Sequence, residues 1–302
     1  MKPLKILLLG KNGQVGWELQ RSLAPLGQLI VLDADNQELC GDFTNLEGLA
    51  KTIRDVAPDI IVNAAAHTAV DKAESEPEMA RTINALAPAV LAKEAKRIGA
   101  WLIHYSTDYV FDGSGNKLWL EADPTGPISV YGKTKLEGEQ AILASGCKYL
   151  IFRTSWVYSA RGGNFAKTML KLAQERDSLK VIDDQIGAPT GADLLADVTA
   201  HSIRTALQCP EVSGLYHLVA MGETSWHEYA SYVIDFARQA GVAIKVSPEA
   251  VHPVPTTAFS TAAKRPMNSR MDTAKLQDTF GLKLPHWQSG VTRMLTEFLE
   301  KL

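Results

Sequence analysis

Short runs of consecutive apolar residues alternate with amphipathic stretches along the first half of the chain. The apolar runs are rich in Leu, Ile and Val and are predicted to be buried strands. They lie at 4–9, 29–32, 59–63, 101–106 and 149–153. Between them, apolar residues recur three and four positions apart, as they do on one face of a helix. This periodicity predicts helices at 15–23, 46–56, 77–98 and 129–143.

The order of these elements indicates the fold class. Strands without polar alternation need cover on both faces, and a helix between consecutive strands supplies it through a right-handed crossover. We therefore expect an α/β fold with a doubly wound, Rossmann-like parallel sheet. Gly99 is expected to end the helix 77–98, and Ser129 to cap the helix that follows it.

The pattern loosens after about residue 153, which indicates a second unit. Helices are predicted at 164–174 and 194–207, between segments rich in Gly and Pro, and the stretches 248–255 and Arg265-Pro266 are predicted loops. The apolar run 214–219 is predicted to return to the main sheet as a strand. We expect residues 1–153 with this returning strand to form the dinucleotide-binding domain. Residues 154–302 are expected to form a smaller, discontinuous substrate domain over the carboxyl ends of the strands.

Composition excludes several classes of protein. The chain has 302 residues, is 46% hydrophobic and 22% charged, and carries a net charge of −3, so it lacks the basic stripe of a nucleic-acid-binding protein. No apolar run approaches the roughly 18 residues of a membrane span, and the run at 1–10 is too short for a signal peptide. The seven histidines show no metal-ligand spacing, and His104 is expected in the core. Three distant cysteines (Cys40, Cys147 and Cys209) are expected to be reduced thiols of a cytoplasmic protein.

A glycine-rich turn joins the first predicted strand to the first helix. It comprises Gly10, Gly13 and Gly16, with Gln14 and Val15 before the third glycine. Glycine permits the tight turn, lets a pyrophosphate approach the backbone, and allows the helix to pack closely on the strand. The spacing is G-x-x-G-x-x-G rather than the common G-x-G-x-x-G, but its position between strand and helix predicts dinucleotide binding.

Other candidate cofactor contacts follow the next two strands. Asp33 closes the second strand, where a carboxylate accepts hydrogen bonds from the adenosine ribose and favours NAD over NADP. Asp42 and Phe43 are predicted to lie at the adenine edge. After the third strand, Ala65 and Ala66 have side chains small enough for the backbone to crowd the cofactor.

Tyr131 and Lys135 are four residues apart on a predicted helix, which places them on one face, whereas Lys133 points elsewhere. A tyrosine has a pKa of about 10, and a nearby ammonium is expected to lower it. Tyr131 then becomes a general acid that protonates a carbonyl oxygen as hydride reaches the carbon. Thr107, at the end of the fourth strand, is expected to hydrogen-bond the same oxygen, and Lys135 to hold the nicotinamide ribose.

In this order, these motifs resemble the extended short-chain dehydrogenase/reductase family. The segments that carry the resemblance are 10–16, 62–71, 105–113, 131–135, 153–158 and 184–190. The glycine turn and the Tyr131/Lys135 pair are typical of the whole superfamily, whereas the remaining segments are similar to its nucleotide-sugar reductases. The resemblance implies that NADPH or NADH gives hydride to the C4 ketone of dTDP-4-dehydro-L-rhamnose and yields dTDP-L-rhamnose.

The resemblance also implies roles for single residues. Tyr131 is implied as the proton donor, Lys135 as its activator and Thr107 as the carbonyl ligand. The implied cofactor contacts are Tyr105 and the segment Ala66, His67 and Thr68. The implied sugar-site residues are Asp108 and Trp156, and the further substrate-side candidates are Asn164, Gln185 and Arg265. An arginine that faces the diphosphate would make charge-assisted contacts.

Some members of the family are associated with Mg²⁺ and a homodimer contact. Glu18, Asp193 and Glu297 are acidic candidates for such a site, although solvated surface acids are an equally good interpretation. Members of the family often use NADPH as well as NADH, so Asp33 leaves the choice of cofactor open.

Two alternatives use the same fold. One is another nucleotide-sugar enzyme, an epimerase or a dehydratase with tightly held NAD⁺. Dehydratases of the superfamily place an Asp-Glu pair after the strand-end Thr, whereas Tyr109 follows Asp108 here, which argues against elimination of water. The other is a non-catalytic regulatory subunit of methionine adenosyltransferase, which could lose Thr107, Tyr131 and Lys135, yet all three are present.

Overall fold

The computed structural model describes residues 3–300, so the first two residues of the N-terminal apolar run and the last two of the chain lie outside it. Its centre is a six-stranded, wholly parallel sheet in the order β10-β5-β4-β3-β1-β2. The strands are β1 (Leu4–Leu9), β2 (Gly27–Leu32), β3 (Ile60–Asn63), β4 (Trp101–Thr107), β5 (Lys148–Thr154) and β10 (Gly214–His217). The chain runs outward from β1 in one direction to β2 and in the other to β3. The carboxyl ends of β1 and β3 therefore flank the point where such sheets bind ligands.

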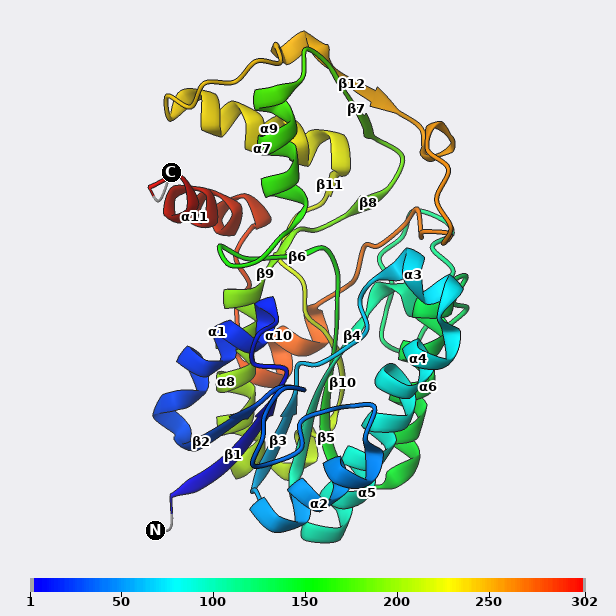
Figure 1. The fold of residues 1–302 in the computed structure, drawn as a ribbon, viewed down its shortest axis with the longest axis vertical. Coiled ribbons are helices and arrows are strands. Elements are labelled where there is room, and N and C mark those ends of the chain that lie inside the picture. The colour runs from blue at the N-terminus through cyan, green and yellow to red at the C-terminus, as the bar shows by residue number, and fades with distance from the viewer. Residues whose placement is uncertain (1–2, 301–302) are drawn as a thin grey trace.

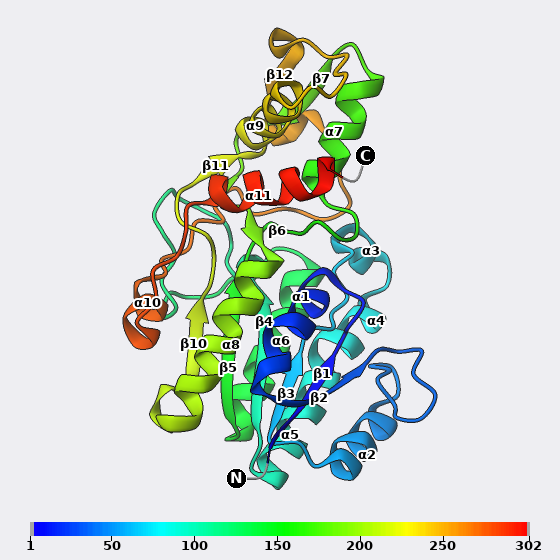
Figure 2. The ribbon, with the colours of Figure 1, turned by 90° about the vertical axis from the view of Figure 1, so that its left-hand side faces the viewer.

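Helices cover both faces of the sheet, as the sequence predicts for strands that are apolar on both sides. One layer holds α1 (Gln14–Leu23) and α8 (Ala192–Gln208), and the other holds α2 (Leu46–Val56), α5 (Ala87–Ile98) and α6 (Val130–Ser145) (Figures 1 and 2). Alternate residues of β1 enter the two cores: Ile6 and Leu8 on the α1 side, and Leu7 and Leu9 on the α2 side. The predicted doubly wound α/β fold is confirmed. Across residues 3–300, no helix combines the length and the apolar character needed to span a bilayer.

The predicted long helix over 77–98 is observed, but a π-helical turn interrupts its α-helical hydrogen bonding. The segment comprises α4 (Pro77–Arg81), a π-helical turn (Thr82–Leu86) and α5, and an unpredicted helix α3 (Val70–Ser75) precedes it. Pro88 has no N–H to donate to the carbonyl of Asn84, and the wider turn accommodates that loss. The Asn84 carbonyl instead lies against Gly138 of α6, where an added Cβ would stand 2.2 Å from it. The predicted caps are observed: Gly99 has φ +75° at the end of α5, and the Ser129 hydroxyl accepts the Gly132 N–H.

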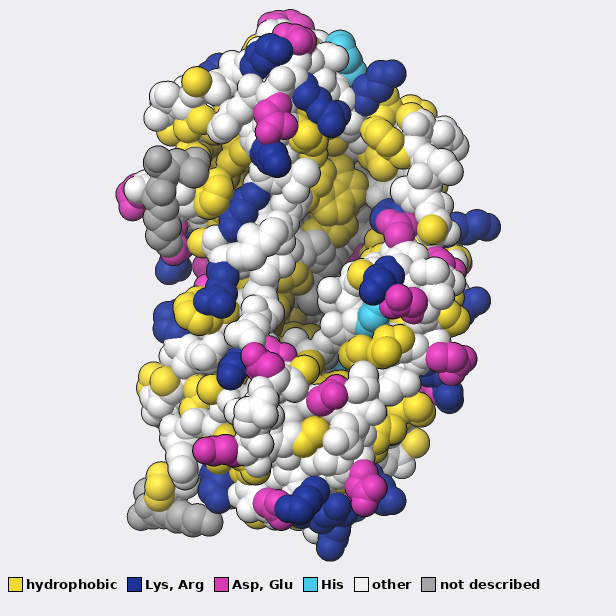
Figure 3. Space-filling view, in the orientation of Figure 1, with side chains coloured by type: hydrophobic (Ala, Val, Ile, Leu, Met, Phe, Trp, Pro, Cys, Tyr) yellow, Lys and Arg dark blue, Asp and Glu magenta, His cyan; other side chains and the backbone are white. Residues whose placement is uncertain are grey.

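The remaining elements gather over the carboxyl ends of the strands (Figure 1). They include α7 (Phe165–Glu175), β7 (Leu179–Ile182), α9 (Trp226–Gln239), β12 (Val251–Val254) and α11 (Trp287–Leu299). The face of the molecule seen in Figure 1 is hollowed between these elements and the sheet, and hydrophobic side chains are visible in the hollow (Figure 3).

The loop predicted at 248–255 is wrong over its second half, because β12 pairs there in parallel with β7. Pro253 is tolerated because the ribbon has only two strands, so its missing N–H can face outward. The strand predicted at 214–219 ends at His217, and β10 lies at the β5 edge of the sheet.

Candidate active site

The glycine turn after β1 forms a close-packed cradle at the start of α1. Gly10 has φ +84°, which a residue with a side chain rarely adopts, and a Cβ there would stand 2.6 Å from the Ala65 nitrogen. A Cβ on Gly16 would stand 2.0 Å from the Gly10 oxygen. No side chain caps the amino end of α1, so its first N–H groups are available to an anion. Asp33 lies against the turn, because its carboxylate accepts the N–H of Asn12 at 3.0 Å.

A cavity of about 420 Å³ opens beside this cradle, at the carboxyl ends of β1, β3, β4 and β5. The predicted residues that line it are Gly13, Gln14, Val15, Ala66, Thr68, Tyr105, Thr107, Asp108, Tyr131, Lys135 and Trp156. The structure thus brings about half of the predicted cofactor residues and all three predicted catalytic residues to one cavity.

Tyr131 lies in this cavity within hydrogen-bonding reach of Thr107. Burial raises the pKa of the Tyr131 phenol to about 12, the Thr107 hydrogen bond opposes the shift, and the Asp108 carboxylate adds to it. The expectation that Lys135 lowers the pKa of Tyr131 is therefore wrong for the protein without bound ligand. The phenol is protonated at neutral pH, which is the state that a proton donor requires.

Lys135 shares the expected helix face with Tyr131 but donates elsewhere. Its Nζ donates to the carbonyl of Tyr105 at 2.6 Å and lies 3.3 Å from Nε2 of His104. Burial lowers the pKa of the Lys135 amine to about 8, and the negative charge of Glu139 opposes that shift. Lys133 is exposed on the other side of the helix, as predicted.

Thr107 and Asp108 form a buried polar group with Ser269. The Thr107 hydroxyl donates to Asp108 Oδ1 at 2.9 Å, and the Ser269 hydroxyl donates to Oδ2 of the same carboxylate. The Thr107 oxygen accepts the backbone N–H of Tyr109 at 3.2 Å. Burial raises the pKa of Asp108 to about 6, and its hydrogen bonds from Ser269 and Thr107 oppose that shift.

Trp156 lines this cavity. A second cavity, of about 400 Å³, lies next to it. The Trp156 ring stacks on that of Trp226, which lines both cavities together with Tyr109. Trp226 donates its indole N–H to Gln185 at 3.1 Å. The second cavity is lined by aromatic, aliphatic and basic side chains, including Phe165, Met169, Arg176, Lys180, Gln185, Phe259 and Arg265.

The remaining predicted residues are placed as follows. Arg265 lines the second cavity but also forms an ion pair with Asp71, with 2.6 Å between Nη2 and Oδ2. Asn164 caps α7 and donates to the Ser159 carbonyl, and it lines neither cavity. Phe43 is buried in the core on the α2 side, and the Asp42 carboxylate accepts the N–H of Thr44.

Asn84, which was not predicted, fixes the position of His67. Its side chain accepts the His67 N–H at 2.9 Å and donates to the His67 carbonyl at 3.1 Å. The same amide donates to Thr134 of α6 at 3.2 Å. The π-helical turn therefore connects the predicted cofactor segment to the helix that carries Tyr131.

Within residues 3–300 no cluster of three His, Cys, Asp or Glu side chains is arranged to hold a metal ion. Burial raises the pKa of Glu18, and the nearby charges of Asp193 and Glu297 raise it further. These acids are therefore close in space although they are distant in sequence. The three cysteines are free thiols.

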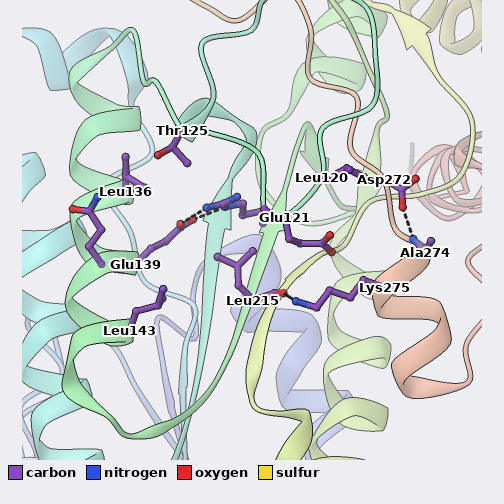
Figure 4. Close-up of a pocket in the computed structure, with 13 residues that line it drawn as sticks. Leu120, Glu121, Thr125, Leu136, Glu139, Leu143, Leu215, Asp272, Ala274 and Lys275 are labelled. Carbon is purple, nitrogen blue, oxygen red and sulfur yellow. Dashed lines mark hydrogen bonds and ion pairs between the residues drawn. The ribbon is translucent and has the colours of Figure 1, made fainter.

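A third cavity, of about 600 Å³, lies at the β10 edge of the sheet beside α6 and α10 (Ala274–Phe280) (Figure 4). The buried ion pair between Arg153 and Glu139 lies at its base, with 2.7 Å between Nη2 and Oε2. Its lining includes neither the glycine turn nor Tyr131, so the candidate active site is the cavity beside the cradle.

Known proteins resemble the chain over almost its whole length. A family model described as the RmlD substrate binding domain matches residues 4–300. The dTDP-4-dehydrorhamnose reductase of Escherichia coli (strain K12) is 61% identical over 294 residues, which cover 97% of this chain and 98% of the relative. A solved dTDP-4-dehydrorhamnose reductase from Clostridium acetobutylicum ATCC 824 superposes with a TM-score of 0.87 at 36% identity, covering 99% of this chain and 100% of that one. One from Bacillus anthracis str. Ames, in complex with NADP, gives 0.86 at 34% identity, covering 98% and 100%.

The fold and these relatives define the class of protein as a dinucleotide-dependent oxidoreductase of the short-chain dehydrogenase/reductase type. The chain belongs to the RmlD substrate-binding-domain family.

Proposed function

We propose that this protein uses NADPH or NADH to reduce the C4 ketone of dTDP-4-dehydro-L-rhamnose to dTDP-L-rhamnose. The observation that carries the proposal is that protonated Tyr131 and the neighbouring Thr107 line the same cavity as the glycine cradle. The Escherichia coli relative is a dTDP-4-dehydrorhamnose reductase, which supports the substrate, and the NADP complex of the Bacillus anthracis relative supports the cofactor.

The residues of the cradle fit a dinucleotide. The close contacts at Gly10 and Gly16 leave no room for side chains where a pyrophosphate would approach, and the uncapped amino end of α1 offers N–H donors. Asp33 is in place to accept hydrogen bonds from the adenosine ribose. We propose that Gln14, Val15, Ala65, Ala66, His67, Thr68 and Tyr105 complete the contacts, with Asp42 and Phe43 near the adenine.

The chemistry requires one hydride and one proton. The reduced nicotinamide supplies the hydride to C4 when it is bound. Tyr131 gives its phenolic proton to the ketone oxygen, so that the C=O group becomes CH–OH and the tyrosine is left as a phenolate, which takes a proton from solvent before the next turnover. Protonated Lys135 stabilises that phenolate and holds the nicotinamide ribose.

Thr107 can bind the ketone oxygen only when its hydroxyl turns away from Asp108. In the free chain the Thr107 proton is donated to that carboxylate. Protonation of Asp108, whose pKa burial raises to about 6, would release the Thr107 donor for the substrate.

The second cavity fits the nucleotide part of the substrate. It joins aromatic surface from Phe259 and Trp226 to the positive charges of Arg176, Lys180 and Arg265. A base can stack on the former, and a diphosphate can pair with the latter. We propose that the sugar lies between Asp108 and Trp156, with Gln185 on its nucleotide side, and that Asn164 acts indirectly by capping α7.

This assignment gives each part of the chain a role. Residues 1–153 and the strand near 214–219 would hold the dinucleotide, and 154–302 would mainly hold the nucleotide sugar, apart from α8, which covers the sheet beside α1. A homodimer remains a prediction, whereas no metal-holding cluster within residues 3–300 supports the predicted Mg²⁺ site at Glu18, Asp193 and Glu297.

The experiment is a spectrophotometric assay on dTDP-4-dehydro-L-rhamnose, generated in situ from dTDP-glucose by the preceding enzymes. Oxidation of NADH and NADPH is followed in parallel, and the product is identified by mass and NMR. We expect substrate-dependent oxidation with dTDP-L-rhamnose as product. A folded protein that binds the dinucleotide but oxidises none of it would contradict the proposal. An epimerase would instead interconvert sugars without net oxidation.

A further inference from the structure

His104 is a buried titratable residue that directly contacts Lys135. It lies on β4 with 1% of its surface exposed, between Asn63 of β3 and Lys135 of α6. Its Nδ1 is 3.0 Å from the amide nitrogen of Asn63, and its Nε2 is 3.3 Å from Nζ of Lys135. The sequence alone suggests only a core histidine, because neither partner is near it in the chain.

Ala65, Asn63, His104 and Lys135 form a row of hydrogen-bonding groups, and the backbone N–H of Ala65 determines which group donates at each step. The Ala65 N–H lies 3.0 Å from Oδ1 of Asn63, and because an N–H can only donate, the atom that faces it must be the amide oxygen. The amide NH₂ group of Asn63 therefore faces His104 and donates to Nδ1. A neutral imidazole that accepts at Nδ1 carries its proton on Nε2.

The charged form of His104 is incompatible with the hydrogen bond that Asn63 donates. Imidazolium has N–H groups at both ring nitrogens, so Nδ1–H would face the amide NH₂ of Asn63. Burial and the adjacent Lys135 hold the pKa of His104 well below its usual range, in agreement with that geometry. The Nε2–H group of His104 thus faces Lys135 at neutral pH.

Only the uncharged amine of Lys135 can accept a hydrogen bond from the Nε2–H group of His104. An ammonium has three donors and no acceptor, so it would oppose Nε2–H, whereas an uncharged amine has a lone pair. The amine can accept from His104 and still donate to the Tyr105 carbonyl at 2.6 Å.

We propose that His104 is a positioning residue for the reaction: held in its Nε2–H form by Asn63, it favours the uncharged amine of Lys135 in the free protein. On the side away from Lys135 the row ends at the backbone N–H of Ala65, so it offers no path for protons in that direction. Its role is to set the charge of Lys135.

The other groups that face Lys135 are consistent with this role. From α6 they are Glu139, which favours the ammonium, and Tyr131, which is neutral. Both carboxylate oxygens of Glu139 are bound by Arg153, at 3.0 and 2.7 Å, so much of the negative charge is neutralised. From β4 the facing groups are His104 and the Tyr105 carbonyl.

The consequence for turnover rests on the proposed function. If the ammonium of Lys135 holds the nicotinamide ribose, dinucleotide binding above about pH 8 must be accompanied by uptake of a proton. The inference about His104 concerns the free chain, so it can be tested even if the proposed reaction is wrong.

The first measurement is the ¹⁵N spectrum of the imidazole groups of the full-length wild-type protein, without ligand, between pH 6 and 9. We expect His104 to show a protonated Nε2 and an unprotonated Nδ1. The Nδ1–H form, or an imidazolium in this range, would overturn the proposal. This measurement does not require any variant to fold.

The second measurement is the titration of Lys135, followed by NMR of the ¹³Cε-labelled lysines and assigned by loss of its signal in Lys135→Arg. In His104→Gln an amide oxygen can take the place of Nε2–H, so the midpoint should rise by at least about one pH unit from its wild-type value. His217→Gln is the matched control, because His217 is equally buried but lies on β10 away from Lys135. Equal midpoints in wild type and His104→Gln, or equal shifts in both variants, would overturn the proposal.

Discussion

The rings of Trp156 and Trp226 stack with their centroids 3.6 Å apart and their planes 14° from parallel. Trp156 has φ +49°, an uncommon conformation for a bulky residue, so the backbone is held in a strained form that presents the ring to its partner. Trp226 lines both the cavity beside the cradle and the basic cavity next to it. Trp226, supported by the Trp156 ring, therefore forms part of the wall that the two cavities share.

Replacing Trp226 by Ala should weaken binding of the nucleotide sugar. The change removes the aromatic stack and the hydrogen bond to Gln185 and leaves the Tyr131 site intact. We expect KM for the sugar nucleotide to rise by about tenfold to a hundredfold, with a smaller effect on kcat. Steady-state kinetics measures both, and Trp226→Phe should retain most of the affinity. Trp17, which is 44% exposed on α1, offers the control Trp17→Ala; equal KM values for Trp226→Ala and wild type would contradict the role of the pair.

Asp33 should govern the preference for NADH over NADPH. Its carboxylate binds the N–H groups of Asn12 and Ala34 beside the cradle, where a ribose phosphate would meet a negative charge. In Asp33→Asn the repulsion is removed, and we expect the ratio of kcat/KM for NADPH to that for NADH to rise by about tenfold. Asp35→Asn is the matched control, since Asp35 is an exposed residue of the same loop. An unchanged ratio in Asp33→Asn would remove Asp33 from cofactor selection.

Asp108 should make stability depend on pH in the acid range. Burial raises its pKa to about 6 in the folded protein, compared with about 3.9 in an unfolded chain. Between these two values the folded state binds more protons than the unfolded state, so the Asp108 contribution to the free energy of unfolding falls as the pH rises through that window. Above about pH 6 the Asp108 contribution to the free energy of unfolding falls no further.

The test is chemical denaturation of wild type and Asp108→Asn at several pH values. The amide cannot ionise, so the variant should be the more stable of the two above pH 6, by up to about 2–3 kcal/mol. The advantage should vanish near pH 4. A difference that is constant with pH would mean that Asp108 does not change its charge on folding.

Lys135 should set the alkaline limit of activity. Burial lowers its pKa to about 8, and the proposed role needs the ammonium. We expect kcat/KM, which reports ionisations of the free enzyme, to be level below that pH and to fall as the pH rises through about 8. Lys135→Met should lose activity at every pH, whereas Lys133→Met on the exposed side of α6 should keep the wild-type profile. A profile that is flat to pH 10 would contradict the role.

Local sequence signals account for the sheet and the main residues of the site. Continuous apolar strands such as Leu4–Leu9 are found within a residue or two of the predicted bounds, because burial on both faces requires that composition. Tyr131, Lys135 and Thr107 meet because the carboxyl ends of parallel strands share one edge of the sheet.

The sequence could not indicate the partners supplied by distant segments. Trp226 and Ser269 reach the site from residues far along the chain, and neither belongs to a motif. β12 is stabilised by pairing with β7 and not by a strand-like pattern of apolar residues in its own sequence. The Pro-containing segment 248–255 is therefore predicted as a loop. The pKa of Tyr131 is governed by burial, which spacing alone does not give.

The central claim is that Tyr131 donates the proton to the ketone. It is tested most directly by single-turnover reduction of dTDP-4-dehydro-L-rhamnose by Tyr131→Phe, with dinucleotide affinity measured on the same protein. Tyr149→Phe, the same chemical change on β5 at a distance from the cavity, is the control. We predict that Tyr131→Phe reduces the ketone about 10² to 10⁴ times more slowly than wild type, at unchanged dinucleotide affinity. A Tyr131→Phe rate equal to that of wild type would contradict the account.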